Sequence, residues 1–188
     1  SEATVFNGDI DCQNMNISDL TGIEAFTALT YLDCTSNQLT FLDVSQNTAL
    51  TDLKCLSNQL QSLDVSNNLA LTTLWCNYNN QLQSLDISQN IALDYLNCSG
   101  IQLTILNVSN NTALTNLKCW GNQLTNLDVS SNTNLTSLDC RYNQITSLDV
   151  SANLALTTLY CHTNPLVSLD VSANLALTTL YCHTNPLV

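Results

Sequence analysis

Leucine returns at fixed places along most of this chain. From Leu29 onward the sequence repeats the pattern L-x-x-L-x-C-x-x-N-x-L-x-x-L-D-V-S-x-N every 21 residues, with one interval of 22 residues. The leucines that open the repeats are Leu29, Leu50, Leu71, Leu93, Leu114, Leu135, Leu156 and Leu177. A fixed period of this length indicates a solenoid, in which each unit buries its apolar side only against its neighbours.

Each repeat divides into two similar halves, and each half ends in asparagine. Leu29–Asn37 reads L-x-x-L-x-C-x-x-N, and Leu39–Asn47 reads L-x-x-L-D-V-S-x-N. Both halves carry the alternation of a half-buried strand, and neither leaves room for a helix. We therefore predict an all-β repeat solenoid with two short parallel strands per coil, two facing sheets and little or no helix. Eight to nine coils stacked about 4.8 Å apart would form a rod of roughly 40 Å.

The repeat divides the chain into two parts. We expect residues 1–28 to form an N-terminal cap or first coil, and residues 29–188 to form eight repeats, the last of them incomplete. The segments 147–167 and 168–188 are identical, which indicates duplication, engineering or a copied repeat. Since no cap follows the last strand, we expect the natural chain to continue beyond Val188, or this end to be covered by another molecule. End-to-end self-association there is a further expectation.

The nine cysteines follow the repeat. Eight occupy one column of the pattern and Cys12 extends it: Cys34, Cys55, Cys76, Cys98, Cys119, Cys140, Cys161 and Cys182. The column lies two residues after an inward leucine, so strand alternation points it inward as well. Zinc needs ligands that converge as a tetrahedron, whereas these lie in a line. We predict a ladder of reduced, buried thiols, with disulfides between neighbouring coils as the open alternative.

Two asparagine columns predict amide ladders along the axis, with a structural role. The columns are Asn37, Asn58, Asn122, Asn143 and Asn164 in one half, and Asn47, Asn68, Asn90, Asn111, Asn132, Asn153 and Asn174 in the other. Ile101 interrupts the first column, one repeat after an extra residue within 77–81. These two irregularities adjoin and indicate a local bend.

Composition narrows the classes of partner. The formal net charge is −12, with Lys54, Lys118 and Arg141 as the only fixed cations, so we expect no nucleic-acid partner. No apolar run approaches the roughly 20 residues of a membrane span, and no segment has the pattern of a signal peptide. We therefore expect no membrane insertion, and a chain that is soluble or held on a surface by other parts.

The outward positions of the two halves differ. In the L-D-V-S half they are nearly constant, as in Ser62, Asp64 and Ser66, whereas in the L-x-C half they vary and include all three fixed cations. Exposed aromatic side chains anchor protein interfaces and can stack on sugar rings, although strands also favour aromatic residues for packing alone. We predict that this half binds a protein or glycan ligand. The candidate binding residues are Tyr31, Asp33, Lys54, Trp75, Tyr95, Lys118, Trp120, Asp139, Arg141, Tyr160, His162, Tyr181 and His183.

Two features raise the question of a metal. A column of aspartates, with Asn107 as its neutral member, comprises Asp43, Asp64, Asp86, Asp128, Asp149 and Asp170. Hydrogen bonds from nearby serines or backbone N–H groups would stabilise this column, and calcium between coils is the alternative. The two histidines belong to the duplicated segment, which explains their stacking without a metal. We predict no metal and no cofactor.

No grouping of residues predicts catalysis. The chain has no serine elbow, no phosphate loop and no outward Cys–His pair, and the repeated aspartates share one environment. We therefore predict no enzymatic activity. The threonine row Thr30, Thr51, Thr72, Thr115, Thr136, Thr157 and Thr178 leaves ice or surface binding as a weaker alternative.

The segments LTYLDCTSNQL, LTDLKCLSNQL, LTNLKCWGNQL and LTSLDCRYNQI resemble the leucine-rich-repeat signature L-x-x-L-x-L-x-x-N-x-L, with cysteine in place of the third leucine. The unit of 21 residues with nested half-repeats is similar to the short bacterial class of that family. The resemblance covers residues 29–188. It implies a leucine-rich-repeat solenoid used for recognition or adhesion, secreted or on the cell surface, and without the convex helix that gives longer repeats their strong curvature.

Overall fold

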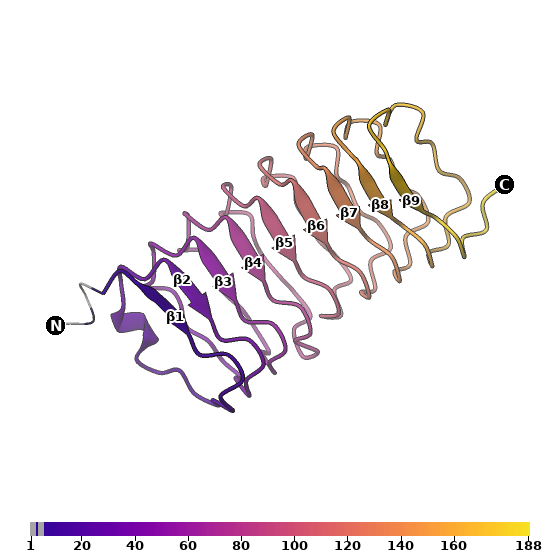
Figure 1. Cartoon of the computed structure of the whole chain (residues 1–188). Coiled ribbons are helices and arrows are strands. Elements are labelled where there is room, and N and C mark those ends of the chain that lie inside the picture. Colours follow the sequence, from indigo (N-terminus) through magenta and orange to yellow (C-terminus); the bar gives the residue numbers. More distant parts are fainter. Residues whose placement is uncertain (1–2, 4–5) are drawn as a thin grey trace.

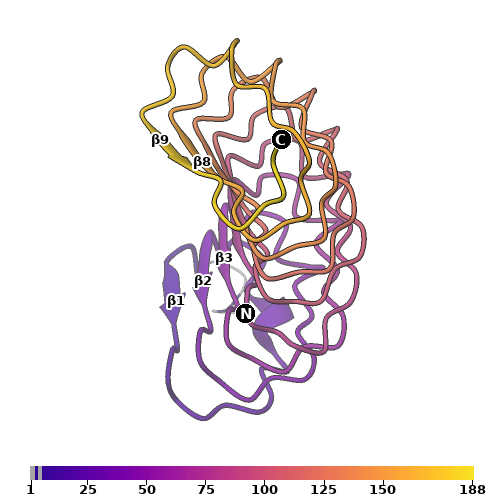
Figure 2. The ribbon, with the colours of Figure 1, turned by 90° about the vertical axis from the view of Figure 1, so that its right-hand side faces the viewer.

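The structure is a computed structural model and describes residue 3 and residues 6–188. The chain winds into a stack of coils, and each coil contributes one strand to a single nine-stranded parallel sheet (Figure 1). The strands are β1 (Asp9–Asp11), β2 (Tyr31–Asp33), β3 (Asp52–Lys54), β4 (Thr73–Trp75), β5 (Tyr95–Asn97), β6 (Asn116–Lys118), β7 (Ser137–Asp139), β8 (Thr158–Tyr160) and β9 (Thr179–Tyr181). They are paired in sequence order from β1 to β9. Seen along the stack, successive coils are rotated, so the stack twists along its length (Figure 2).

The pairing register aligns identical positions of successive repeats. The central residue of each strand, Ile10 in β1 and leucine in β2–β9, pairs with the next, as Leu32 does with Leu53 and Leu53 with Leu74. From β2 to β8 these leucines are fully buried, because side chains in a strand alternate between the two faces and only one face meets the core, whereas Leu180 of β9 is 36% exposed. The predicted all-β solenoid is confirmed. The described residues contain one short 3₁₀ helix, η2 (Ile23–Ala25), and no α-helix.

The prediction of a second strand in each coil is wrong, because the L-D-V-S half forms no strand in the described residues. Its leucine and valine do point inward, as the alternation predicted, but its backbone groups are paired with side chains. The Ser66 N–H donates to Asp64 Oδ1 at 2.9 Å, and the Val65 carbonyl accepts from the Asn90 side chain of the next coil at 2.9 Å. With the donor and acceptor used in this way, no parallel backbone ladder forms there.

The core combines the leucine columns with the predicted cysteine ladder. All nine cysteines are free, and those from Cys34 to Cys161 are fully buried, which confirms the ladder of unpaired thiols. Burial raises the pKa of Cys76 to about 12, because an apolar interior disfavours the thiolate. These thiols therefore act as small apolar side chains rather than nucleophiles.

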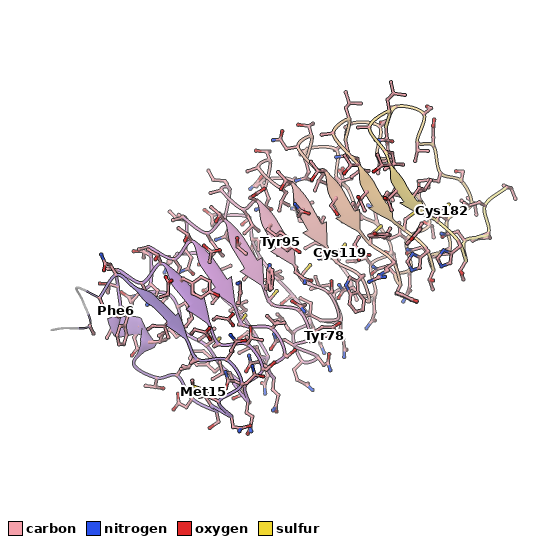
Figure 3. The ribbon with its side chains drawn as sticks, in the orientation of Figure 1. Phe6, Met15, Tyr78, Tyr95, Cys119 and Cys182 are labelled. Atoms are coloured by element: carbon pink, nitrogen blue, oxygen red, sulfur yellow. The ribbon has the colours of Figure 1, made fainter. Side chains whose placement is uncertain are left out.

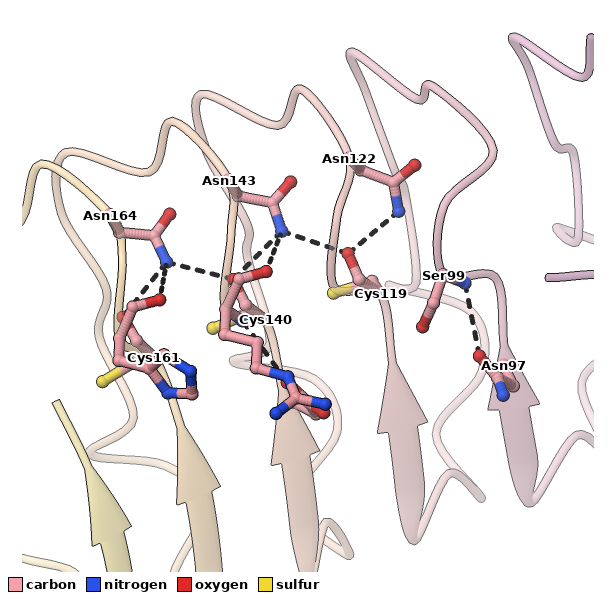
Figure 4. Close-up of polar contacts among 11 residues, drawn as sticks. Asn97, Ser99, Cys119, Asn122, Cys140, Asn143, Cys161 and Asn164 are labelled. Atoms are coloured by element: carbon pink, nitrogen blue, oxygen red, sulfur yellow. Dashed lines mark hydrogen bonds and ion pairs between the residues drawn. The ribbon is translucent and has the colours of Figure 1, made fainter. Parts of the chain in front are cut away.

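The first asparagine ladder joins each coil to the one before it (Figure 4). Asn143 Nδ2 donates to the Cys140 carbonyl of its own coil at 3.0 Å and to the Cys119 carbonyl of the preceding coil at 3.1 Å. Asn143 Oδ1 accepts from the Leu124 N–H at 3.0 Å. One buried amide thus satisfies backbone groups that the three-residue strands leave unpaired.

The structure also places Asn79 in this ladder, since it bonds the Cys55 and Cys76 carbonyls and the Leu60 N–H. The extra residue of that coil therefore follows the ladder position and enlarges the turn without displacing the amide. In the next coil the apolar Ile101 occupies the position, so the first ladder has no bond from the β5 coil to the β4 coil.

The second asparagine ladder ties the opposite side of the coils. Asn68 Nδ2 donates to the Val44 carbonyl at 3.0 Å and to the Asn47 carbonyl at 2.9 Å, both in the preceding coil. The Asn68 Oδ1 is buried without a hydrogen-bond partner in the described part of the chain, as are its equivalents along the column. This ladder is uninterrupted from Asn47 to Asn174.

The start of the chain joins the same stack. β1 pairs in parallel with β2, so a coil is already present within the segment 1–28. Asn47 Nδ2 donates to the Ile23 and Phe26 carbonyls, each at 2.9 Å, so η2 provides the acceptors that valine and asparagine provide later. Residues 1, 2, 4 and 5 lie outside the described residues, and the division at residue 28 stays a prediction.

Replacing Asn143 by alanine should lower the free energy of unfolding by about 2–4 kcal/mol, because buried backbone donors and acceptors would lose their partner. Urea unfolding followed by circular dichroism measures this loss. Asn126→Ala is the matched control, since Asn126 is exposed and its loss should cost about 0.5 kcal/mol or less. Equal losses in the two variants would contradict a structural role of the ladder.

A thiol-reactive dye at about pH 8 should label Cys182 first, because its side chain is only half-buried. The thiols from Cys34 to Cys161 should react only as urea unfolds the chain. A Cys182→Ser variant should lose the fast phase. Rapid labelling of several thiols in the folded variant would show that the ladder is accessible.

Candidate functional site

The LxC face is defined here as the outward side chains of β1–β9 and of the turn that follows each strand. Because the pairing register is constant, these side chains form columns with neighbours about 4.8 Å apart. Figure 3 shows the side chains along the stack, with Tyr78, Tyr95 and Cys119 labelled near its middle. All the predicted binding residues lie on this face.

In the N-terminal part of the face, a lysine is held between aromatic rings. Lys54 Nζ lies 4.9 Å from the ring centroids of both Tyr31 and Trp75 and donates a hydrogen bond to the Tyr31 hydroxyl at 3.1 Å. That hydrogen bond raises the pKa of Lys54, so its charge is held more firmly. Trp75 contacts Tyr95 at a centroid distance of 5.6 Å, and Lys118 Nζ lies 5.5 Å from the Tyr95 ring.

The C-terminal part repeats this arrangement with arginine. Arg141 Cζ lies 5.2 Å from the Trp120 ring and 5.9 Å from the Tyr160 ring, one in the preceding coil and one in the following coil. Tyr160 in turn contacts Tyr181 at 5.0 Å. All three fixed cations of the chain therefore lie over aromatic rings, each contact worth roughly 0.5–2 kcal/mol depending on exposure.

The two histidines stack on each other as the repeat predicts. The His162 and His183 rings are 4.3 Å apart and 16° from parallel, and Tyr142 meets His162 edge-on at 5.4 Å. Burial, the His183 ring and the Arg141 charge lower the pKa of His162. His162 is therefore a neutral packing residue at physiological pH.

The tryptophan faces are occupied by the chain itself. Trp75 lies between Lys54 from the preceding coil and Tyr95 from the following coil. Trp120 has Arg141 on one side and Tyr78, at 5.7 Å, on the other. The indoles therefore do not present a free flat face of the kind on which a sugar ring stacks.

Three of the predicted surface residues are buried. Asp33, Asp139 and His162 are each about 5–6% exposed, although their positions point away from the core. Longer neighbours cover them: the Tyr31 hydroxyl donates to Asp33 Oδ2 at 3.3 Å, and Arg141 Nε lies 3.3 Å from Asp139 Oδ1. Burial raises the pKa of Asp139, and the charges of Arg141 and Lys118 oppose that shift.

Sequence reasoning missed Tyr78 and Tyr142, which are about half exposed and pack against Trp120 and His162. Both occupy the turn after the strand with a positive φ, 59° for Tyr78 and 54° for Tyr142, where strand alternation no longer predicts direction. Tyr78 reaches a ring two coils away because Gly100 lies between. A Cβ at Gly100 would come within 3.4 Å of the Tyr78 ring. The signal in the sequence was an aromatic residue in a column of serine, threonine and glycine.

On the other half of each coil, the aspartate column caps turns. Asp64 Oδ1 accepts from the Ser66 backbone at 2.9 Å, and the hydrogen bonds from Ser66 lower the pKa of Asp64. Asn107 accepts from the Ser109 N–H in the same way at 3.0 Å, so a neutral amide performs the same role. The described residues contain no group of three or more His, Cys, Asp or Glu side chains that could hold a metal ion.

The threonine row is a ladder at the start of the strands. Thr51 Oγ1 donates to the Thr30 carbonyl at 3.1 Å, and Thr72 Oγ1 donates to the Thr51 carbonyl at 3.1 Å. These hydroxyls are half-buried and paired, so they do not form a flat row of free hydroxyl groups.

One open hollow of about 370 Å³ lies on the L-D-V-S side, between Gln83, Asp86, Thr104 and Asn107, next to the enlarged turn. Leu85 and Ile105 give it apolar walls beside the amide and hydroxyl side chains. Among the described residues no helix is long and apolar enough to cross a membrane.

Comparison with known proteins identifies the class. A family model described as "Leucine Rich repeats (2 copies)" matches residues 112–155. The solved structure of internalin C2 from Listeria monocytogenes covers 96% of this chain and 73% of its own length with a TM-score of 0.69; at 23% identity it shows the fold alone. The chain is a leucine-rich-repeat protein with coils of 21 residues.

Among individual proteins, the chain is similar to InlJ of the same bacterium. A functional domain of InlJ, described as including a cysteine ladder, is 49% identical over 98% of this chain, with a TM-score of 0.96. Internalin J of strain F2365 is 58% identical over 38 residues. This chain spans 41% of the length of the InlJ domain and 4% of the length of that internalin J. The likeness supports a bacterial leucine-rich-repeat protein.

The aspartate column should make the stability of the fold depend on pH in the acidic range. Hydrogen bonds lower the folded-state pKa of Asp149 below its ordinary value of 3.8, so its stabilising contribution is present above that value and is lost as the pH falls below it. Asp149→Asn keeps the acceptor for Ser151, as Asn107 does for Ser109, and should lose less in melting temperature between about pH 4 and pH 2.

The reverse change, Asn107→Asp, should increase the loss in melting temperature over the same pH range. Melting curves recorded by circular dichroism across this range measure both slopes. Unchanged slopes in both variants would contradict the turn-capping role of the carboxylates.

Proposed function

We propose that this chain is a non-enzymatic recognition or adhesion scaffold and that its LxC face binds a protein ligand. The observation that carries the proposal is the segregation of side chains: every fixed cation and nearly all the large outward aromatic residues lie on one face of a rigid stack. Aromatic residues and arginine are the residue types that anchor protein interfaces.

The contrast between the two halves of each coil supports this assignment. The L-D-V-S half repeats the same capping residues from coil to coil because its backbone needs them. From β2 to β9, only Asp33, Asn97 and Asp139 in the LxC half accept from the backbone in this way, and the outward residues differ in every coil except the duplicated pair. A surface free to vary on a constant backbone is typical of recognition by repeat proteins.

A protein ligand fits the geometry better than a neutral glycan. Sugar binding by stacking needs an open aromatic face, whereas Trp75 and Trp120 are flanked by the chain's own cations and rings. The exposed features are ring edges, the Tyr78 and Tyr142 hydroxyl ends and the cation heads, which suit polar and apolar side chains of a protein. The likeness to InlJ supports a protein of the bacterial surface or one that is secreted.

The double variant Trp75→Ala/Trp120→Ala should lose most of its affinity for a ligand found by screening surface proteins and glycans with the unchanged chain. Removing both indoles also frees Lys54 and Arg141 from their fixed positions, so we expect a loss of about 100-fold or more. Surface plasmon resonance measures the affinity.

Phe41→Ala is the matched control, because Phe41 is an exposed aromatic residue of the L-D-V-S half. Its affinity should equal that of the unchanged chain. A double variant that remains folded and binds with full affinity would refute the proposed face, and a ligand that proves to be a neutral glycan would refute the proposed ligand class.

A further inference from the structure

Arg141 is the only arginine of the chain, and its environment fixes its guanidinium group in place. The group lies between the rings of Trp120 and Tyr160, and its Nε atom lies 3.3 Å from Asp139 Oδ1. The rings come from the coils on either side, and Asp139 is buried beneath. A side chain held on three sides loses little further freedom when it binds a ligand.

The two Nη atoms of Arg141 have no such partner. Within residues 6–188, no oxygen accepts a hydrogen bond from either of them, and the side chain is 35% exposed. The contact with Asp139 is an ion pair through Nε that lacks hydrogen-bond geometry. The outer edge of the guanidinium, which donates two parallel hydrogen bonds, is therefore free.

The surroundings of Arg141 are locally positive on a strongly acidic chain. Lys118 and Arg141 both act on the one carboxylate of Asp139, which gives two positive charges to one negative charge. Lys54, by comparison, has two carboxylates acting on it, those of Asp33 and Asp52. With a formal net charge of −12, the chain repels anions at long range, so an anion can be attracted only where the local balance is reversed.

We propose that Arg141 is a carboxylate-binding site that takes a glutamate or aspartate side chain of a protein ligand. The planar Nη edge matches the two oxygens of a carboxylate, a geometry that lysine cannot reproduce. The rings of Trp120 and Tyr160 flank the approach and contact the methylene groups of the incoming side chain. Lys118, one coil away, provides a second positive charge for a neighbouring acidic residue. The inference rests on the proposed function and names the chemistry of its ligand.

The single arginine makes the site directly observable, because the chain gives one side-chain Nε–H signal in a ¹⁵N-correlated NMR spectrum. Titration with a peptide of six glutamates should shift this signal in a saturable manner that weakens as salt is added. A peptide of six glutamines should leave it unchanged. An equal shift with both peptides, or no shift with either, would overturn the proposal.

Backbone amide signals near residue 141 then report the affinity of the variants. Arg141→Lys keeps the charge and removes the paired donors, so binding of the glutamate peptide should weaken about tenfold. Lys54→Gln, which removes a cation elsewhere on the same face, should change it by less than about twofold. Equal weakening by the two substitutions would show a general charge effect and would overturn the site.

A fully galacturonic-acid oligosaccharide distinguishes the source of the carboxylate. Tight binding of the sugar acid together with absence of binding by the glutamate peptide would overturn the assignment to a protein side chain. The test of the Arg141 site can fail independently of the test of the LxC face. If Trp75→Ala/Trp120→Ala abolishes ligand binding and the Arg141 signal does not shift with the glutamate peptide, the proposed face is supported and the carboxylate site is refuted. If the double variant binds its ligand with full affinity and the Arg141 signal does shift, the face is refuted as the binding site of that ligand.

Discussion

The hydrogen bonds between asparagine side-chain amides and the backbone of the preceding coil are the constraint on which this structure depends. Strands of three residues offer few backbone pairs, and the L-D-V-S half offers none within a strand ladder. Two amides per coil provide the missing bonds, as Asn143 and Asn153 do for their coil. The ladders favour a constant repeat length, because a coil of another length would displace its amides from the carbonyls of the preceding coil. The one extra residue is accommodated just after Asn79, where it enlarges a turn and leaves the amide in position.

The fixed register also explains the outer face. Adjacent coils are about 4.8 Å apart, which is close to the distance at which a cation rests on an aromatic ring. A ring in one coil and a lysine or arginine in the next therefore meet without any special backbone, as Lys54 and Trp75 do at 4.9 Å. The spacing required by the interior thus brings the outward residues together into groups of contacting rings and charges.

Much of this structure could be predicted from the sequence, because its period is explicit. The inward leucines, the free thiol ladder and both amide columns follow from the spacing alone. The second strand could not be excluded in that way, since the alternation around Val65 is the same whether side chains or backbone groups satisfy its neighbours. Alternation likewise predicts the direction of a side chain in a strand but not which neighbours cover it. The burial of Asp139 and the contact that Tyr78 makes across Gly100 therefore could not be predicted from the sequence.

Because Ile101 interrupts the first amide ladder, the junction between the β4 and β5 coils differs in strength from the other junctions of the stack. Between the β4 and β5 coils the sheet pairing and the second amide ladder continue, whereas the first ladder skips a step. There an exposed hydrogen bond, from Gln102 Nε2 to the Asn80 carbonyl at 3.0 Å, stands where the neighbouring junctions have the buried bonds of the first ladder. Water competes for an exposed bond more readily than for a buried one, so under a tensile force along the axis we expect this junction to yield first and the stack to part into two blocks that each keep their internal order.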